Sequence, residues 1–251
     1  MSLTLTPLPG IPLIQEGDDL AKIVLQSLGN VQLELQEGDI IVFTQKIVSK
    51  AEGRHVNLAE VTPSPQAETL AAETEKDPRL VELLLKESKQ VLRKRPGLII
   101  VEHNLGFICA NAGIDHSNVA GSDDWILLLP EDPDASARVL RRGLENSSGA
   151  RLGVLIIDSH GRAWRNGTVG VTIGISGLPG IVDLRGTIDL FGYELQVTEV
   201  GAADELAAAA SLMMGQVAEG TPVVHVRGFP YPLREADFNE ILRPEEKDMF
   251  R

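Results

Sequence analysis

A run of apolar side chains near the middle of the chain most restricts how it can fold. Residues 152–157, LGVLII, carry no polar side chain, and residues 40–43, IIVF, share this character. A strand with one face in water alternates apolar and polar residues, whereas a strand buried on both faces does not. The run at 152–157 therefore predicts a strand covered on both faces by other layers.

The remaining pattern mixes helices with strands and predicts an α+β fold. Glycine recurs from Val169 to Ile188, which we interpret as strands broken by tight turns. A single domain over residues 1–251 is expected, with two sub-lobes and a helical excursion at about 63–96. Apolar spacing predicts helices at 18–28 with Asp18 as N-cap, at 66–95 in two pieces split before Pro78, at 134–144 and at 202–217. Apolar runs and turn residues predict strands at 31–35, 40–44, 98–101, 125–129, 152–157 and 223–227.

Charge and cysteine usage narrow the class of protein. The formal net charge of −13 argues against a nucleic-acid partner, which requires a basic surface. One cysteine, Cys109, excludes an internal disulfide and suits a reducing compartment. The first residues, MSLTLTPLPG, lack the features of a signal peptide, and the apolar runs are too short to span a bilayer. We expect a cytoplasmic protein without membrane contact.

A cationic cluster follows the predicted strand at 40–44. Lys46, Lys50 and Arg54 lie within eleven residues, 44–54, of an otherwise acidic chain. Lysine binds phosphate as a point charge and arginine as a fork, so the cluster suits a phosphate ligand. A solvated loop with incidental charge is the alternative. The sequence contains neither a P-loop motif nor a glycine-rich dinucleotide motif.

A second cluster, CANAGIDHSN at 109–118, combines small residues with oxygen ligands. Asp115 and Asn118 offer the hard donors that Mg²⁺ or Mn²⁺ prefers. An Asx turn around either residue is the alternative. We interpret Cys109 as a buried filler of the core and His116 as a hydrogen-bonded or surface histidine.

A third cluster, DSHGRAWR at 158–165, follows the buried run. Asp158 at the end of a buried strand would be held rigidly, as a catalytic or metal-binding carboxylate must be. Adjacent Asp, Ser and His side chains point in different directions and cannot form a hydrolase triad. One carboxylate with two arginines and a tryptophan favours a metal–phosphate site.

Together these clusters resemble one family, the coenzyme F420 gamma-glutamyl ligases, over almost the whole chain. The similar segments are LPGIPLIQEGDDL at 8–20, GDIIVFTQKIVSKAEGR at 38–54, ANAGIDHSNV at 110–119, LGVLIIDSHGRAWRNGTVGVTIG at 152–174, DLRGTIDLFGYEL at 183–195, ADELAAAASLMMGQ at 203–216 and PVVHVRG at 222–228.

The resemblance implies a family-specific mixed α/β fold that forms a homodimer. It implies a ligase that uses GTP and divalent metal, Mg²⁺ or Mn²⁺, with K⁺ as an additional ion. Its substrates would be L-glutamate and the phospholactyl carboxylate of the deazaflavin F420-0. A flavin-binding reductase extension, fused behind some bacterial relatives, is not expected here.

The resemblance also implies roles for individual residues. Asp115 and Asp158 would bind metal, with Ser159 and Gln216 as further ligands, and Lys50 would join the two aspartates in catalysis. The Gln45-Lys46 pair departs from the small hydroxyl residues common in relatives. The implied nucleotide-binding residues are Ile11, Pro12, Leu13, Ile14, Gln45, Lys46, Lys50, Asn118, Met214, Gly215, Gln216, Val217, Ala218, Glu219, Gly220 and Thr221.

Two alternative functions and one interface remain as expectations. The chain could be a ligase of the same fold for another carboxylate, or a non-catalytic nucleotide-binding module. Apolar residues in the glycine-rich region, which one chain would leave uncovered, are expected to form the dimer contact; the alternative is that they face the core of their own protomer. These residues are Leu178, Ile181, Val182 and Leu184.

Overall fold

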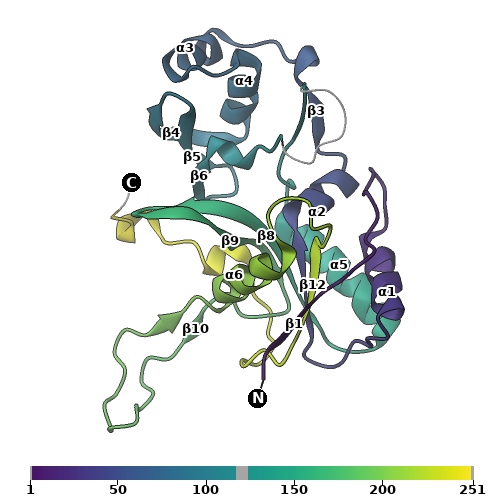
Figure 1. Cartoon of the computed structure of the whole chain (residues 1–251). Helices are drawn as coiled ribbons and strands as arrows, with labels where there is room; N and C mark the ends of the chain where they lie inside the picture. Colours follow the sequence, from purple (N-terminus) through teal and green to yellow (C-terminus); the bar gives the residue numbers. More distant parts are fainter. Residues whose placement is uncertain (1, 117–123, 250–251) are drawn as a thin grey trace.

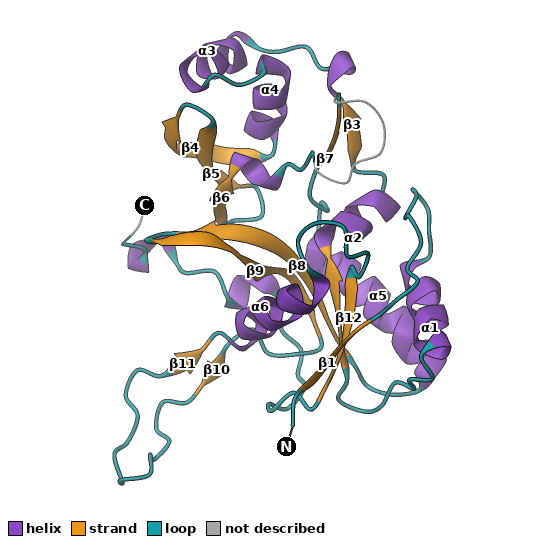
Figure 2. Ribbon diagram, viewed as in Figure 1, coloured by secondary structure: helices purple, strands orange, loops and turns teal. Residues whose placement is uncertain are grey.

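A computed structural model describes residues 2–116 and 124–249 of the chain. A central five-stranded sheet has the order β1-β12-β2-β8-β9, and smaller sheets surround it (Figure 2). β2 pairs with β8 in parallel and the other neighbours are antiparallel. The helices are α1 (Leu20–Asn30), α2 (Gln45–Ala51), α3 (Pro65–Thr74), α4 (Pro78–Lys86), α5 (Pro133–Ser148) and α6 (Ala202–Met214). The strands are β1 (Thr4–Pro7), β2 (Ile40–Thr44), β3 (His55–Asn57), β4 (Ser88–Arg95), β5 (Leu98–His103), β6 (Ile108–Ala110), β7 (Trp125–Leu127), β8 (Gly153–Arg162), β9 (Arg165–Ser176), β10 (Val182–Asp183), β11 (Glu199–Val200) and β12 (Val223–Arg227).

The central sheet is buried on both faces, as the apolar run predicted. In β8, Val154 and Ile156 belong to one core cluster, and Leu155 and Ile157 belong to another. Helices α1 and α5 contribute to the first cluster, and α6 contributes to the second (Figure 1). Alternate side chains of β8 therefore enter different apolar layers, which explains why the strand shows no polar alternation.

Glycines in β9 allow two helices to approach the sheet closely. A Cβ atom on Gly170 would lie 2.5 Å from the Ala207 carbonyl oxygen of α6, and one on Gly174 would lie 2.6 Å from the Pro133 carbonyl oxygen of α5. We predicted strands broken by turns from Val169 onward. β9 runs unbroken to Ser176, because Gly170 and Gly174 serve packing rather than turns. The predicted turns follow only after this strand, where Gly177 and Gly186 adopt positive φ.

Three predictions about element boundaries are wrong for local reasons. The N-cap of α1 is Asp19, whose carboxylate accepts from the Lys22 amide, and not Asp18. Residues 31–35 form a turn and loop, because the Val31 amide still bonds back to α1 and Gln32 adopts a left-handed φ of 55°. Asp158 does not end its strand, since β8 continues to Arg162 by pairing with β9.

The excursion above the central sheet is only partly helical (Figure 1). Ser64 and Asp77 cap α3 and α4, and each helix has proline in its first turn, as expected between 66 and 86. Residues 88–95, predicted as helix, form β4 instead. Their backbone pairs with the buried strand β5, which is flanked on its other side by β6. Among the described residues, no helix is long and apolar enough to cross a membrane.

Candidate functional site

Helix α2 presents a cationic pair beside an aspartate. The Lys46 Nζ atom lies 2.8 Å from Oδ2 of Asp115. Lys50 lies one turn further along α2, and burial together with the charge of Lys46 lowers the pKa of its ammonium, while Asp115 acts in the opposite direction. The cationic cluster predicted after β2 is therefore present, and it faces one of the predicted metal ligands.

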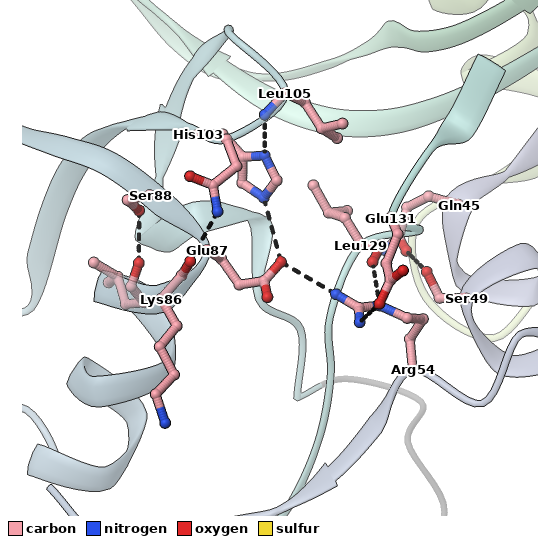
Figure 3. Close-up of polar contacts among 12 residues, drawn as sticks. Gln45, Ser49, Arg54, Lys86, Glu87, Ser88, His103, Leu105, Leu129 and Glu131 are labelled. Atoms are coloured by element: carbon pink, nitrogen blue, oxygen red, sulfur yellow. Dashed lines mark hydrogen bonds and ion pairs between the residues drawn. The ribbon is translucent and has the colours of Figure 1, made fainter. Parts of the chain in front are cut away.

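Gln45 at the start of α2 holds an unused hydrogen-bond donor. Its Oε1 accepts from the Ser49 hydroxyl at 2.9 Å (Figure 3), whereas its buried Nε2 has no partner among the described residues. A buried amide donor without an acceptor is costly. The side chain therefore suits a ligand oxygen, even though glutamine here departs from the family pattern.

Backbone structure fixes the position of Asp115. Its amide and carbonyl both bond to Leu127, at 3.0 and 2.9 Å. Ala112 adopts a left-handed φ of 53°, and the Asn111 side chain accepts from the Ile99 amide. Small residues are thus required in this tight turn, as the sequence indicated. Asn118, predicted to bind nucleotide, lies outside the described residues.

Two predicted metal ligands from distant segments meet beside Asp158. The Ser159 hydroxyl donates to Gln216 Oε1 at 3.1 Å, and Gln216 Nε2 donates to Ser211 at 3.0 Å.

Burial and the charge of Asp158 raise the pKa of the Cys109 thiol to about 12. This thiol is buried, as predicted, and stays protonated at neutral pH.

The loop 214–221 between α6 and β12 already gathers backbone donors around an anion. The Val217 amide donates to the Glu219 carboxylate at 2.8 Å, and backbone hydrogen bonds lower the pKa of Glu219. The Thr221 hydroxyl donates to the Met214 carbonyl at 3.0 Å and closes the loop. Because convergent amides bind anions, the Glu219 carboxylate occupies a position that suits a phosphate.

The segment 11–14, which the sequence analysis predicts to bind nucleotide, is only partly buried. Ile14 is buried in the core beside α1, whereas Leu13 is largely exposed. The Gln15 amide donates to Asp18 at 2.8 Å and holds the turn that follows. The segment thus combines a fixed end with side chains available to a ligand.

Arg54 connects the segment before α5 with the end of α4 in the helical excursion (Figure 3). Its guanidinium donates to the Leu129 carbonyl at 2.8 Å, to Glu131 at 2.9 Å and to Glu87 at 3.2 Å. Next to Glu87, burial lowers the pKa of His103 to about 4, so its imidazole is neutral at pH 7. Arg54 is therefore committed to protein carboxylates, unlike the phosphate role that the cluster at 44–54 suggested.

Among the described residues, the predicted metal ligands form two groups: Asp115 pairs with Lys46, and Asp158 and Ser159 pair with His160 and Gln216. Within residues 2–116 and 124–249, no three His, Cys, Asp or Glu side chains form a metal cluster. The oxygens of Asp115, Asp158, Ser159 and Gln216 would therefore act with ligand oxygens, as Mg²⁺ sites commonly do. The Lys46 ammonium on Asp115 shows that this carboxylate accommodates a cation.

One contact was missed by the sequence interpretation. His160 Nε2 lies 3.0 Å from Asp158 Oδ2. The signal was available, because residues two apart on a strand share a face. The expectation that the side chains of Asp158 and His160 point in different directions is therefore wrong for this pair.

Comparison with known proteins identifies the family of the chain. The model of the F420-0:gamma-glutamyl ligase family matches residues 10–228. A coenzyme F420:L-glutamate ligase of Methanothermobacter thermautotrophicus is 46% identical over 253 aligned residues, covering all of both chains. Ligases of the same name from Methanopyrus kandleri and Archaeoglobus fulgidus are 45% and 43% identical over this whole chain and 98% and 97% of theirs. The chain therefore belongs to the F420-0:gamma-glutamyl ligase family.

Proposed function

We propose that this chain joins L-glutamate to the free carboxylate of the deazaflavin F420-0, with GTP as the phosphoryl donor. Relatives that share its full length are coenzyme F420:L-glutamate ligases. The observation that carries the proposal is the pairing of Ser159 with Gln216, which joins the third cluster to the anion-holding loop 214–221. A binding module alone would have no need of both parts.

The reaction must first activate a poor electrophile. The carboxylate oxygen attacks the γ-phosphorus of GTP, the bond to the β-phosphate oxygen breaks, and GDP leaves. The glutamate amine then attacks the resulting acyl phosphate, the carbon–oxygen bond breaks, and inorganic phosphate leaves as the amine loses a proton. Phosphoryl transfer depends mainly on positioning and on neutralising oxygen charge.

The cationic pair of α2 supplies fixed positive charge for the nucleotide. Lys50 is partly buried, so its ammonium acts in a medium that screens charge less than water does. Lys46 now neutralises Asp115 at 2.8 Å and would turn to phosphate oxygens when another cation takes that carboxylate. Gln45 Nε2 and the amides of loop 214–221 would donate to further oxygens of GTP.

Asp115, Asp158, Ser159 and Gln216 would hold the divalent metal. Bound Mg²⁺ or Mn²⁺ would neutralise charge on the phosphate oxygens, which an acidic protein otherwise repels. His160 would orient the Asp158 carboxylate, and Ser211 would orient the Gln216 amide. The contribution of K⁺ follows only from the family resemblance.

Mass spectrometry of the product tests this proposal. The full chain is incubated with F420-0, glutamate, Mg²⁺ or Mn²⁺, and GTP. We expect F420-0 to gain one or more glutamate residues, with GDP and phosphate formed in equal amounts. Reactions that contain ATP in place of GTP, or lack glutamate, are the controls. GTP binding without any product would support the module, and glutamylation of another carboxylate alone would support the alternative ligase.

We also propose that the chain forms a homodimer, through a surface next to the one first expected. Leu178 is fully buried in its own protomer and is not an interface residue, whereas Ile181, Val182 and Leu184 are half-buried. The arm that connects β10 and β11 projects from the body (Figure 2) and exposes Leu190 at 98% and Phe191 at 94%. The Asp189 carboxylate accepts hydrogen bonds from the amides of Phe191 and Tyr193, which fix the turn at the tip of the arm. Exposed apolar clusters of this kind favour a second copy of the chain.

A further inference from the structure

The distal end of the β8–β9 hairpin carries an exposed tryptophan between two arginines. β8 ends at Arg162 and β9 begins at Arg165, so Ala163 and Trp164 form the turn. Trp164 is 88% exposed, and every residue from Gly161 to Thr168 is exposed. In Figure 1 both strands extend well beyond the rest of the central sheet. This end of the hairpin therefore contributes little to the protein core.

Three features of this turn oppose local stability. Trp164 adopts a left-handed φ of 63°, which is unfavourable for a bulky residue. Arg162 and Arg165 lie directly opposite each other, where like charges repel. The indole keeps a large apolar surface in water. Local rules broken together are characteristic of functional sites.

The same strand connects this turn with the metal-binding carboxylate. Asp158 and His160 occupy alternate positions of β8 and share one face, and Arg162 follows them after a shift in the pairing with β9 between Gly161 and Arg162. Asp158 and Arg162 are four residues apart, which corresponds to roughly 13 Å along a strand. A long, flat anion with its reacting carboxylate near Asp158 would thus extend along this face toward Trp164.

We propose that this hairpin end binds the deazaflavin substrate. Trp164 stacks on the fused ring, and Arg162 and Arg165 bind the phosphate between the ring and the reacting carboxylate. The order of groups in the substrate, carboxylate, phosphate and ring, matches the order Asp158, Arg162 and Trp164 along the hairpin. The two arginines also provide positive charge for an anion in a chain of net charge −13. This inference rests on the proposed function.

Direct binding of F420-0, without GTP, glutamate or metal, tests the inference. In a Trp125→Phe background Trp164 is the only tryptophan, so its fluorescence reports on the hairpin alone. We expect F420-0 to quench this fluorescence. We also expect Trp164→Ala to raise the Kd for F420-0 about 10-fold, measured by the fluorescence anisotropy of the deazaflavin, since stacking on an aromatic side chain contributes that much or more. Trp164→Phe should retain most of the affinity, and Arg162→Ala and Arg165→Ala should each weaken binding several-fold. Trp125→Phe alone is the matched control and should bind as wild type does.

The outcomes separate this inference from the proposed function. Normal F420-0 binding by both the wild type and Trp164→Ala would overturn the role of the hairpin alone. A loss of dimer mass in Trp164→Ala, with unchanged F420-0 affinity, would assign the turn to the contact between copies and would also overturn it. A wild-type chain that binds GTP and not F420-0 would overturn the proposed function, and this inference with it. Unchanged melting temperatures are expected throughout, because the substituted side chains lie outside the core.

Discussion

The imidazole Nε2 of His160 lies 3.0 Å from Oδ2 of Asp158, two positions earlier on β8. The His160 ring is itself held by Phe107, whose centroid is 5.2 Å away, and Phe107 stacks on His103. One carboxylate oxygen of Asp158 is therefore fixed by a packed imidazole, which leaves its other oxygen for a different partner. Such outer contacts commonly set the affinity of a metal site.

Replacing His160 with alanine should weaken metal binding rather than the fold. Asp158 would lose the partner that orients it, so we expect Mn²⁺ affinity to fall about 10-fold, measured by electron paramagnetic resonance in the presence of GTP. His160→Gln offers an amide donor of similar reach and should recover most of the affinity. Wild-type Mn²⁺ affinity in His160→Ala would contradict the positioning role.

Asp158→Asn and Asp115→Asn should each reduce ligation by about 100-fold or more at saturating metal. Each exchange removes the charge that phosphoryl transfer requires and changes little volume. The melting temperature should stay within a few degrees of wild type. Asp183→Asn, which breaks an exposed ion pair with Arg185, is the control and should keep full turnover. Near-normal turnover in either site variant would remove that residue from the metal site.

Lys50→Ala should weaken GTP binding by about 10-fold or more, because the charge that it removes is only partly screened by solvent. Calorimetric titration with GTP gives the affinity directly. Lys86→Ala changes a lysine that is exposed on another helix, α4, and serves as the matched control. An unchanged GTP affinity, or a collapsed melting transition, would contradict the assignment of Lys50.

Asp39 should make stability depend on pH in the acid range. The Arg227 guanidinium and His225 hydrogen-bond to this buried carboxylate at 2.7 and 2.8 Å, and the pKa of Asp39 falls to about 2 although burial opposes the shift. The ionised carboxylate thus adds about 2 kcal/mol to the free energy of unfolding above pH 4, and this stabilisation is lost as the pH falls toward 2.

Asp39→Asn tests this directly by denaturant unfolding at several pH values. At pH 7 we expect the free energy of unfolding of Asp39→Asn to be about 3 kcal/mol lower than that of the wild type, because Arg227 keeps its charge without its partner. The difference between variant and wild type should shrink as the pH falls below 4. A difference that stays constant from pH 7 to pH 3 would show that ionisation of Asp39 is not its cause.

Charges placed on the arm should dissociate the dimer. We expect Leu190→Asp and Phe191→Asp to give a monomer mass near 27.1 kDa by light scattering, where the wild type gives about twice that value. Leu212→Asp, at an 85% exposed position of α6, is the control and should stay dimeric. Leu178→Asp should instead unfold the protomer, since this side chain is fully buried. A monomeric wild type would refute the dimer, and a dimer that survives both arm variants would place the interface elsewhere.

Local pattern was enough to predict much of the fold and to locate the polar clusters. Apolar runs identified β2, β8 and most of β12, because a strand buried on two faces is mainly apolar. The prolines predicted helices that begin near residue 66 and at Pro78, and α3 and α4 begin at Pro65 and Pro78. The three polar clusters were likewise visible, because each lies within about eleven consecutive residues.

Contacts between distant segments were decided only by the tertiary structure. Residues 88–95 became β4 because β5 offered backbone partners that helix propensity does not register. Leu178 packs beside Gly153 in the core, so a residue that looked available for a partner is buried. Ser159 hydrogen-bonds to Gln216, which is 57 residues away in the sequence, and Asp39 hydrogen-bonds to Arg227, which is 188 residues away. The sequence by itself therefore determined which segments form strands, helices and polar clusters, whereas pairing across long stretches of chain depends on the packing of the whole molecule, which no local periodicity encodes.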